Sequence, residues 1–155
     1  MLFRSKEITS GIENPPPIHL LYGELKDVEM NELYNHPKIK CMVTITKGEG
    51  FGRPLLEFTM TGKPVISSNW SGQKDFLDND FALLIGGELT EVDSSVVDNF
   101  IINHSKWFTA DYNEFILTLR VVKEKYNSYL NRFETLRLNN SKNFSFEKIK
   151  IIING

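Results

Sequence analysis

Four short apolar runs, separated by polar segments that contain glycine and proline, mark the first 85 residues of the chain. Each run has the length of a β-strand and is apolar almost throughout, rather than alternating between apolar and polar positions. Continuous apolar strands are typical of a parallel sheet whose two faces are both covered. The predicted strands are Ile18–Tyr22, Cys41–Thr46, Pro64–Ser68 and Phe81–Ile85.

Helices are predicted between these strands. Asp27 is a suitable N-cap for a helix that ends at His36-Pro37, because the residue before a proline avoids helical backbone angles. Arg53-Pro54 opens a second helix, which Gly62 closes, and Gln73–Leu77 forms a short helical turn. The alternation of strands and helices predicts an α/β fold with a Rossmann-like parallel sheet of about four strands.

The C-terminal part of the chain has a different pattern, in which apolar residues recur every three or four positions. This spacing predicts one amphipathic helix of about six turns, followed by a polar break and a short helix from Ser145 towards Ile153. We therefore expect a linker or truncated end at residues 1–17, a Rossmann-like domain at 18–110 and C-terminal helices at 111–155. The apolar residues of the long helix are Phe115, Leu119, Val122, Tyr126, Leu130 and Phe133.

The composition of the chain gives no indication of several common classes of partner and site. The net charge of −2 gives no indication of nucleic-acid or anionic-membrane binding, and no apolar run approaches the roughly 20 residues that span a bilayer. The single cysteine, Cys41, excludes an internal disulfide, and the three histidines are too scattered to predict a metal site. The N-terminus has no secretory signal pattern, so a cytoplasmic setting is expected.

The segment with the clearest chemistry is Gly48-Glu-Gly-Phe-Gly-Arg-Pro-Leu-Leu-Glu57, between a predicted strand and a predicted helix. Glycine lets a ligand approach the backbone closely, and free N–H groups at a helix start favour an anion such as phosphate. Glu49 and Glu57 place one carboxylate before the last two glycines and one after them. One of these carboxylates could accept hydrogen bonds from sugar hydroxyls and the other from a ribose diol. The segment matches neither a Walker P-loop nor a dinucleotide fingerprint, and a tight turn without any ligand is an equal alternative.

Taken together with its flanks, this segment resembles the signature of retaining, family-4-type glycosyltransferases of the GT-B fold (group 1). The resemblance extends downstream through Gly62–Ile66 and Trp70–Gly72, and upstream to Leu21–Gly23 and Leu33-Tyr34. It implies that the chain is part of the C-terminal, donor-binding half of such an enzyme, and that residues 18–110 are an incomplete nucleotide-sugar-binding domain. It also implies transfer from a nucleotide-diphosphate sugar with retained anomeric configuration, and neither a cofactor nor a metal.

The resemblance also implies a role for each matching residue. Glu49 is the candidate catalytic residue and would contact the donor sugar, while Glu57 would accept hydrogen bonds from the ribose. Arg53 and Leu55 would lie near the diphosphate. The remaining candidates would act through the backbone. The amides of Gly50, Phe51 and Gly52 would line the sugar and diphosphate site. The backbone at Glu24 and Leu25 would line the base pocket.

Departures from the family pattern shape the expected activity. The family has two Rossmann-like halves, and this chain has no room for the N-terminal, acceptor-binding half or for the Arg/Lys pair that binds the diphosphate. We therefore expect a fragment that is inactive alone, whose partners are the nucleotide sugar and the missing domain, with self-association through exposed helices. The alternatives are a stand-alone nucleotide-binding or interaction module, part of a GT-B sugar-nucleotide epimerase, and a plain scaffold.

Three further features have an ordinary structural interpretation. Asp78-Asn-Asp80 could hold a metal in a different fold of transferase, but a solvated turn is favoured here. Lys47 is predicted to be a surface lysine rather than a phosphate ligand. Trp70 could either stack on a ligand or pack against the neighbouring turn.

Overall fold

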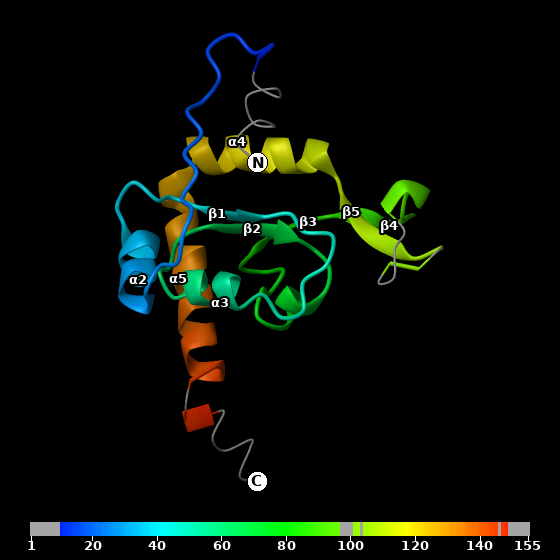
Figure 1. The fold of residues 1–155 in the computed structure, drawn as a ribbon. Helices are drawn as coiled ribbons and strands as arrows, with labels where there is room; N and C mark the ends of the chain where they lie inside the picture. The colour runs from blue at the N-terminus through cyan, green and yellow to red at the C-terminus, as the bar shows by residue number, and fades with distance from the viewer. Residues whose placement is uncertain (1–9, 97–100, 103, 146, 149–155) are drawn as a thin grey trace. The chain divides into compact units, whose positions relative to one another are not determined.

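The computed structural model describes residues 10–96, 101–102, 104–145 and 147–148 (Figure 1). The chain divides into two compact units, Met1–Leu33 and Tyr34–Gly155. Helix α2 (Asp27–Asn35) spans the boundary between them, and it ends before His36-Pro37 as predicted. At its start, the Lys26 amide donates to the Glu29 carboxylate at 2.7 Å, which satisfies one of the N–H groups that a helix start leaves free.

The predicted strand in the first unit is wrong. Ile18–Tyr22, all within the described part of the chain, have no regular secondary structure and pair with no other strand. Their apolar side chains are also exposed, Leu21 to 69% and Tyr22 to 97%. An apolar run becomes a strand only where a neighbouring strand accepts its backbone hydrogen bonds, and this run has no such neighbour.

The second unit is built on a parallel sheet of three strands in the order β1-β2-β3. The strands are β1 (Met42–Thr44), β2 (Val65–Ser68) and β3 (Leu83–Ile85), with Val43 opposite Ile66 and Ile66 opposite Leu83. The α/β class and the parallel sheet are therefore confirmed. The sheet has slightly fewer strands than the predicted four because Ile18–Tyr22 does not join it.

Helix α3 (Arg53–Thr59) connects β1 to β2. Its start and end follow the local signals, with Pro54 in the first turn and Gly62 three residues after the last helical residue at a φ of 67°. A side chain at position 62 would be strained at this φ, and its Cβ would lie 2.9 Å from a carboxylate oxygen of Glu134. The positive φ explains why glycine ends this helix, because the carboxylate of Glu134 is the end of a flexible, exposed side chain that can move.

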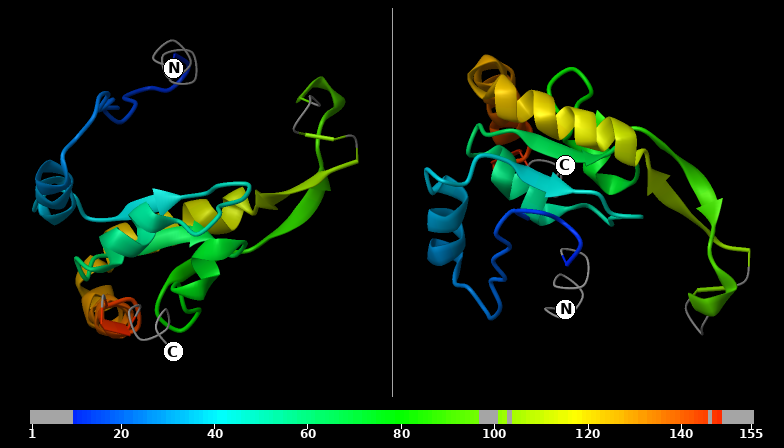
Figure 2. Two further views of the ribbon diagram at one scale, coloured as in Figure 1. Left: turned by 60° about the horizontal axis from the view of Figure 1, so that its bottom comes forward. Right: turned by 90° about the horizontal axis from the view of Figure 1, so that it is seen from above.

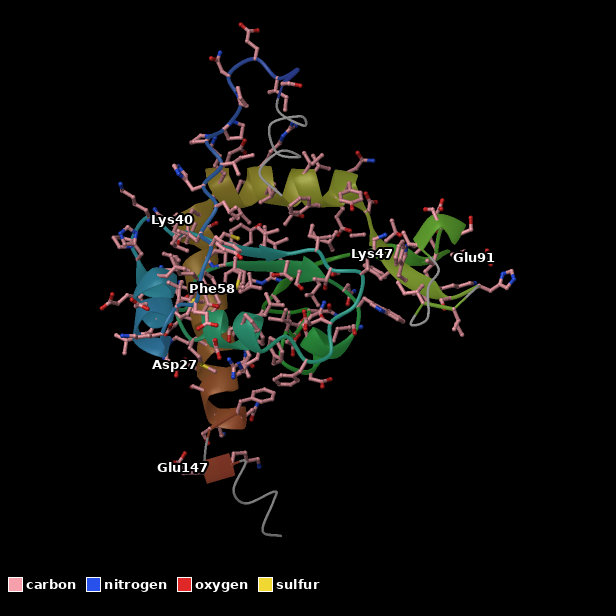
Figure 3. All side chains as sticks on the ribbon, in the orientation of Figure 1. Asp27, Lys40, Lys47, Phe58, Glu91 and Glu147 are labelled. Atoms are coloured by element: carbon pink, nitrogen blue, oxygen red, sulfur yellow. The ribbon has the colours of Figure 1, made fainter. Side chains whose placement is uncertain are left out.

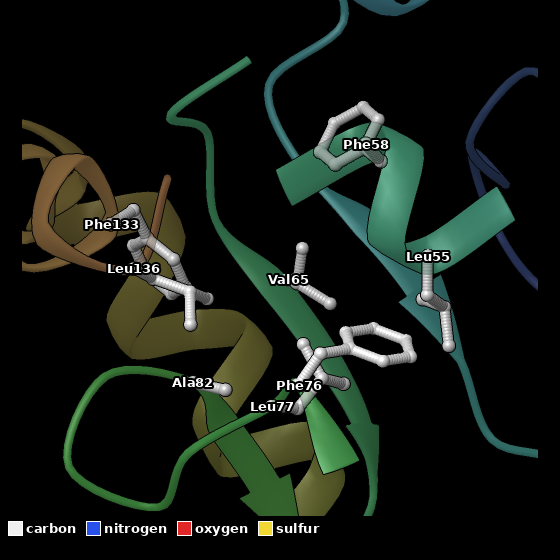
Figure 4. Close-up of a cluster of buried hydrophobic side chains, with 8 residues drawn as sticks. All are labelled: Leu55, Phe58, Val65, Phe76, Leu77, Ala82, Phe133 and Leu136. Atoms are coloured by element: carbon white, nitrogen blue, oxygen red, sulfur yellow. The ribbon is translucent and has the colours of Figure 1, made fainter. Parts of the chain in front are cut away.

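Each face of the sheet is covered by its own apolar cluster, because neighbouring residues of a strand point to opposite faces. Val65 belongs to the first cluster, which lies among α3, α5 and the segment before β3 (Figure 4). Ile66 belongs to the second, which lies under α4 together with the hairpin strand β5. The buried residues of the first cluster are Leu55, Phe58, Val65, Phe76, Leu77, Ala82, Phe133 and Leu136; those of the second are Ile66, Ile85, Phe108, Ala110 and Val122.

An antiparallel hairpin, which the sequence analysis did not predict, follows β3. It consists of β4 (Gly87–Glu91) and β5 (Lys106–Ala110), with Leu89 opposite Phe108. Figure 2 shows this ribbon extending beyond the carboxyl ends of the three parallel strands. A Cβ at Gly87 would lie 2.2 Å from the Thr109 carbonyl oxygen, so the hairpin depends on glycine where it leaves the sheet.

The single long helix predicted for the tail is wrong, because the chain bends at Lys125. Helix α4 (Tyr112–Glu124) lies over one face of the sheet, and α5 (Tyr126–Asn143) packs with α3 on the other (Figure 1). The apolar periodicity continues across the bend, so periodicity alone could not reveal it. The predicted helix from Ser145 towards Ile153 falls mostly outside the described residues. Among the described helices, none is long and apolar enough to cross a membrane.

Candidate functional site

The glycine-rich segment forms a loop, residues 47–52, at the carboxyl end of the parallel sheet. It leaves the sheet after β1 and leads into α3, with Gly52 as the N-cap at a φ of 84°. Open α/β sheets bind ligands beyond the carboxyl ends of their strands. The loop therefore lies where this fold class places its ligands.

Four consecutive backbone amides, three at the end of this loop and one at the first residue of α3, have no hydrogen-bond partner among the described residues. Within the described residues, the N–H groups of Gly50, Phe51, Gly52 and Arg53 donate to no other group, whereas those of Leu55 and Leu56 both donate to the Gly52 carbonyl, Leu55 at 2.9 Å. A run of unpaired amides at a loop is a site for an anion. The Leu55 side chain is buried in the core, at 2% exposure, so its predicted diphosphate contact stays a prediction.

A second loop, residues 69–72 after β2, fastens the glycine loop in place. The Ser71 hydroxyl donates to the Glu49 carbonyl at 2.6 Å and accepts from the Glu49 amide at 3.2 Å. The Gly72 amide donates to the same carbonyl at 3.0 Å. A Cβ at Gly72 would lie 1.8 Å from the Gly50 carbonyl oxygen, so the two loops are in direct backbone contact.

Polar side chains lie beneath these loops. Gln73 is fully buried, and its side-chain amide donates to the Ser68 carbonyl at 3.1 Å, while the Ser68 hydroxyl donates to the Thr46 carbonyl at 2.9 Å. Four buried side-chain oxygens have no hydrogen-bond partner in the described structure: Thr46 Oγ1, Ser67 Oγ, Asn69 Oδ1 and Gln73 Oε1. All four belong to segments at or after the carboxyl ends of β1 and β2. Unpartnered buried oxygens are uncommon, and their concentration here marks this end of the sheet as a polar site.

The two predicted carboxylates lie on the loop and on the first turns of α3. Glu49 is half-buried, and its Cγ lies 3.2 Å from the position that a Cβ on Gly52 would take. Glu57 is exposed and pairs with Arg53 at 3.1 Å, one helical turn before it. Because the side chain of Arg53 is 81% exposed, this ion pair contributes little to stability and both partners remain accessible to a ligand. Burial, followed by the charge of Glu57, raises the pKa of Tyr34.

The aromatic residues around the loop are used in packing. The Phe51 ring packs against Phe76 and Phe144, with centroids 5.2 and 5.9 Å apart. Trp70 is stacked on Phe108, with centroids 5.9 Å apart and ring planes within 3° of parallel. Trp70 thus packs against strand β5, a partner that neither interpretation of Trp70 named, and its indole remains 39% exposed.

Residues of the hairpin reach this site, and the sequence analysis missed them. The Lys47 ammonium lies 3.2 Å from the centroid of the Trp107 ring, and the Phe108 amide donates to the Lys47 carbonyl at 3.1 Å. Figure 3 shows Lys47 between the ends of the parallel strands and β5. The alternating sequence Lys106-Trp-Phe-Thr-Ala110 was the available signal for a strand here.

The Asp78-Asn-Asp80 segment lies in a local polar turn. The Asp80 amide donates to the Asp78 carboxylate at 2.7 Å, which is the hydrogen bond of a local polar turn. In the described part of the chain, no three His, Cys, Asp or Glu side chains converge in a way that could hold a metal ion. Glu24 and Leu25 belong to the first unit and are exposed, so their role at a base pocket stays a prediction.

Comparison with known protein families finds a match for this chain. A family model described as glycosyl transferases group 1 matches residues 14–95, more than half of the chain. The chain belongs to the group 1 glycosyltransferase family. The group 1 match includes the glycine loop, α3, the second loop and the whole parallel sheet, and it ends within the segment between β4 and β5. No curated protein matches the chain.

Proposed function

We propose that this chain binds the nucleotide-sugar donor of a retaining, family-4-type glycosyltransferase, as part of the C-terminal half of a GT-B fold. Membership of the group 1 family supports the reaction class. The observation that carries the proposal is the row of unpaired amides at residues 50–53, at the carboxyl end of a parallel sheet. These amides offer directed hydrogen bonds to the oxygens of a diphosphate.

Charge around this row favours the same ligand. The guanidinium of Arg53 is exposed beside the last of the four amides, and its only ion pair in the described residues is the one with Glu57. Charged hydrogen bonds from guanidinium to phosphate are strong and directional, whereas an exposed ion pair contributes little. A bound diphosphate can therefore draw Arg53 away from Glu57 at small cost. The released carboxylate is then free to accept hydrogen bonds from the ribose hydroxyls.

Glu49 would act on the sugar. It precedes the glycine row in the chain, whereas Glu57 follows it, and its backbone is held by Ser71 and Gly72. In the transfer, the bond between the anomeric carbon and the diphosphate oxygen breaks, the acceptor hydroxyl oxygen bonds the same carbon with retained configuration, and the hydroxyl proton passes to the leaving diphosphate. This chain's part is to hold the leaving diphosphate through amides and Arg53, while Glu49 fixes the sugar through its hydroxyls.

Titration of the isotope-labelled chain tests the proposal. UDP, GDP and ADP are added in turn, and the amide resonances of residues 50–53 are followed by NMR. We expect one nucleotide to shift all four, and Glu57→Ala to weaken its binding about tenfold, or about 1.4 kcal/mol, because charged hydrogen bonds to the ribose are lost.

A matched control separates a specific contact from a change in net charge. Glu124→Ala removes one exposed carboxylate from the end of α4, away from the loop, and should leave the affinity unchanged. If none of the three nucleotides shifts the amides of residues 50–53, the proposed function is wrong. If binding occurs but Glu57→Ala behaves like Glu124→Ala, then Glu57 does not contact the ribose.

A further inference from the structure

Ser71 has a backbone conformation that is normally restricted to glycine. Its φ is 73° and its ψ is −161°. A residue with a Cβ is strained in this region, and such strain persists only where the surrounding structure holds it in place. Position 71 carries a side chain although its backbone would suit glycine better, and the glycine of this loop is at the next position, Gly72. The side chain at position 71 therefore needs an explanation of its own.

The hydroxyl of Ser71 supplies that explanation. It bonds both backbone groups of one residue, donating to the Glu49 carbonyl and accepting from the Glu49 amide. With the bond from the Gly72 amide, three hydrogen bonds join this short segment to Glu49 alone. A glycine at position 71 would adopt the same backbone without strain, but it would lose two of the three bonds.

Glu49 is thus held at both of its backbone groups by the segment Ser71-Gly72. The amides of the next four residues have no partner among the described groups. Holding the backbone of Glu49 limits where its carboxylate can reach, and the packing of its Cγ against Gly52 limits it further. The position of one carboxylate is therefore set by a residue 22 positions later in the chain.

We propose that Ser71 is a positioning residue that orients Glu49 toward the sugar of the donor. The proposal rests on the proposed function and deepens it. The hydroxyl touches neither sugar nor phosphate. It acts through Glu49, so its contribution is restricted to ligands that carry the sugar.

The test compares each nucleoside diphosphate with its sugar derivative: UDP with UDP-glucose, GDP with GDP-mannose and ADP with ADP-glucose. Affinities are measured by calorimetry for the wild-type chain and for Ser71→Ala. We expect Ser71→Ala to weaken binding of the sugar nucleotide about tenfold, while binding of the matching diphosphate changes less than about twofold. In a Glu49→Gln background, the same substitution should have no further effect on either ligand.

Two further variants separate the hydroxyl from the backbone strain and from a general loss of structure. Ser71→Gly relieves the strain and also lacks the hydroxyl, so it should match Ser71→Ala. Ser68→Ala removes a nearby hydroxyl that bonds the Thr46 carbonyl rather than Glu49, and it should bind both ligands like the wild type. Amide hydrogen exchange provides a readout without ligand, since exchange at the Glu49 amide should accelerate in Ser71→Ala and remain slow in Ser68→Ala.

Each outcome decides between the two proposals. If the wild-type chain binds a sugar nucleotide and Ser71→Ala weakens it and its diphosphate equally, or leaves both unchanged, the positioning role alone is overturned. The same holds if Ser71→Gly binds like the wild type, because strain rather than the hydroxyl would then be responsible. If the wild-type chain binds none of the six ligands, the proposed function fails and the positioning role fails with it.

Discussion

Replacing Gly72 with alanine is the most direct way to test whether the two loops are in contact. The added Cβ would lie 1.8 Å from the Gly50 carbonyl oxygen, 2.6 Å from its carbon and 3.0 Å from the Phe51 Cα. All three atoms belong to the backbone, so no side chain can rotate out of the way. Because Cβ contacts below 3.0 Å do not occur in folded proteins, the glycine loop has to move away from position 72.

The size of the effect follows from two losses. Overpacking of a well-packed site typically costs about 1–3 kcal/mol. Moving the loop also stretches the bond from the Gly72 amide to the Glu49 carbonyl, which is worth about 1 kcal/mol. We therefore expect Gly72→Ala to lower the free energy of unfolding by about 2–4 kcal/mol, and the Tm by about 4–15 °C for a domain of this size.

Urea denaturation followed by circular dichroism, together with calorimetry, measures both quantities. Gly48→Ala is the matched control, because it makes the same substitution in the glycine loop at a position with no heavy atom within 4 Å of the new Cβ. It should change the free energy of unfolding by less than about 0.5 kcal/mol. If Gly72→Ala is as stable as Gly48→Ala, the loops are not in contact and Ser71 cannot hold the backbone of Glu49.

Two further predictions concern the core. Burial raises the pKa of Cys41 to about 12, so little of the reactive thiolate is present at pH 8. Alkylation by iodoacetamide at this pH should therefore be on the order of 100 to 1000 times slower in the folded chain than in urea. Equal rates would contradict the burial of the thiol. Arg132 donates from its guanidinium to the carbonyls of residues 79, 81 and 82, so Arg132→Met should lower the free energy of unfolding by about 1.5–3 kcal/mol in a urea titration. Arg120→Met, at an exposed position of α4, is the control for this substitution. If Arg132→Met lowers the free energy of unfolding no more than Arg120→Met does, the three bonds do not stabilise the fold.

The sequence predicted the part of the fold that local signals determine. The segment from β1 through α3 to β2 has two apolar strands, a proline in the first turn of the helix and a glycine after it, and each signal acts within a few residues. Local signals, the closely spaced glycines between a strand and a helix, also predicted the loop that carries Glu49 and precedes Glu57. The pair between Arg53 and Glu57 is also local, since it joins residues one turn apart on a helix.

The features that the sequence analysis missed depend on partners far along the chain. β4 and β5 are separated by 14 residues, so neither strand carries a turn signal that links it to the other. The bend at Lys125 has no glycine or proline to mark it, and it arises because α4 and α5 pack on opposite faces of the sheet. Ser71 was seen only as part of a family motif, because its partner lies 22 residues away.

The bend at Lys125 also has a consequence for the order in which the domain is assembled during synthesis. The residues that close the first face of the sheet, Phe133 and Leu136, follow every strand in the chain, and so does Arg132, which fastens the segment leading into β3. Until α5 has left the ribosome, only α3, the glycine loop and the segment before β3 can cover Val65 and Phe76 on that side. The nascent chain therefore exposes apolar surface on one face of an incomplete sheet while the hairpin and α4 are translated. We expect chaperones to bind this surface during that interval.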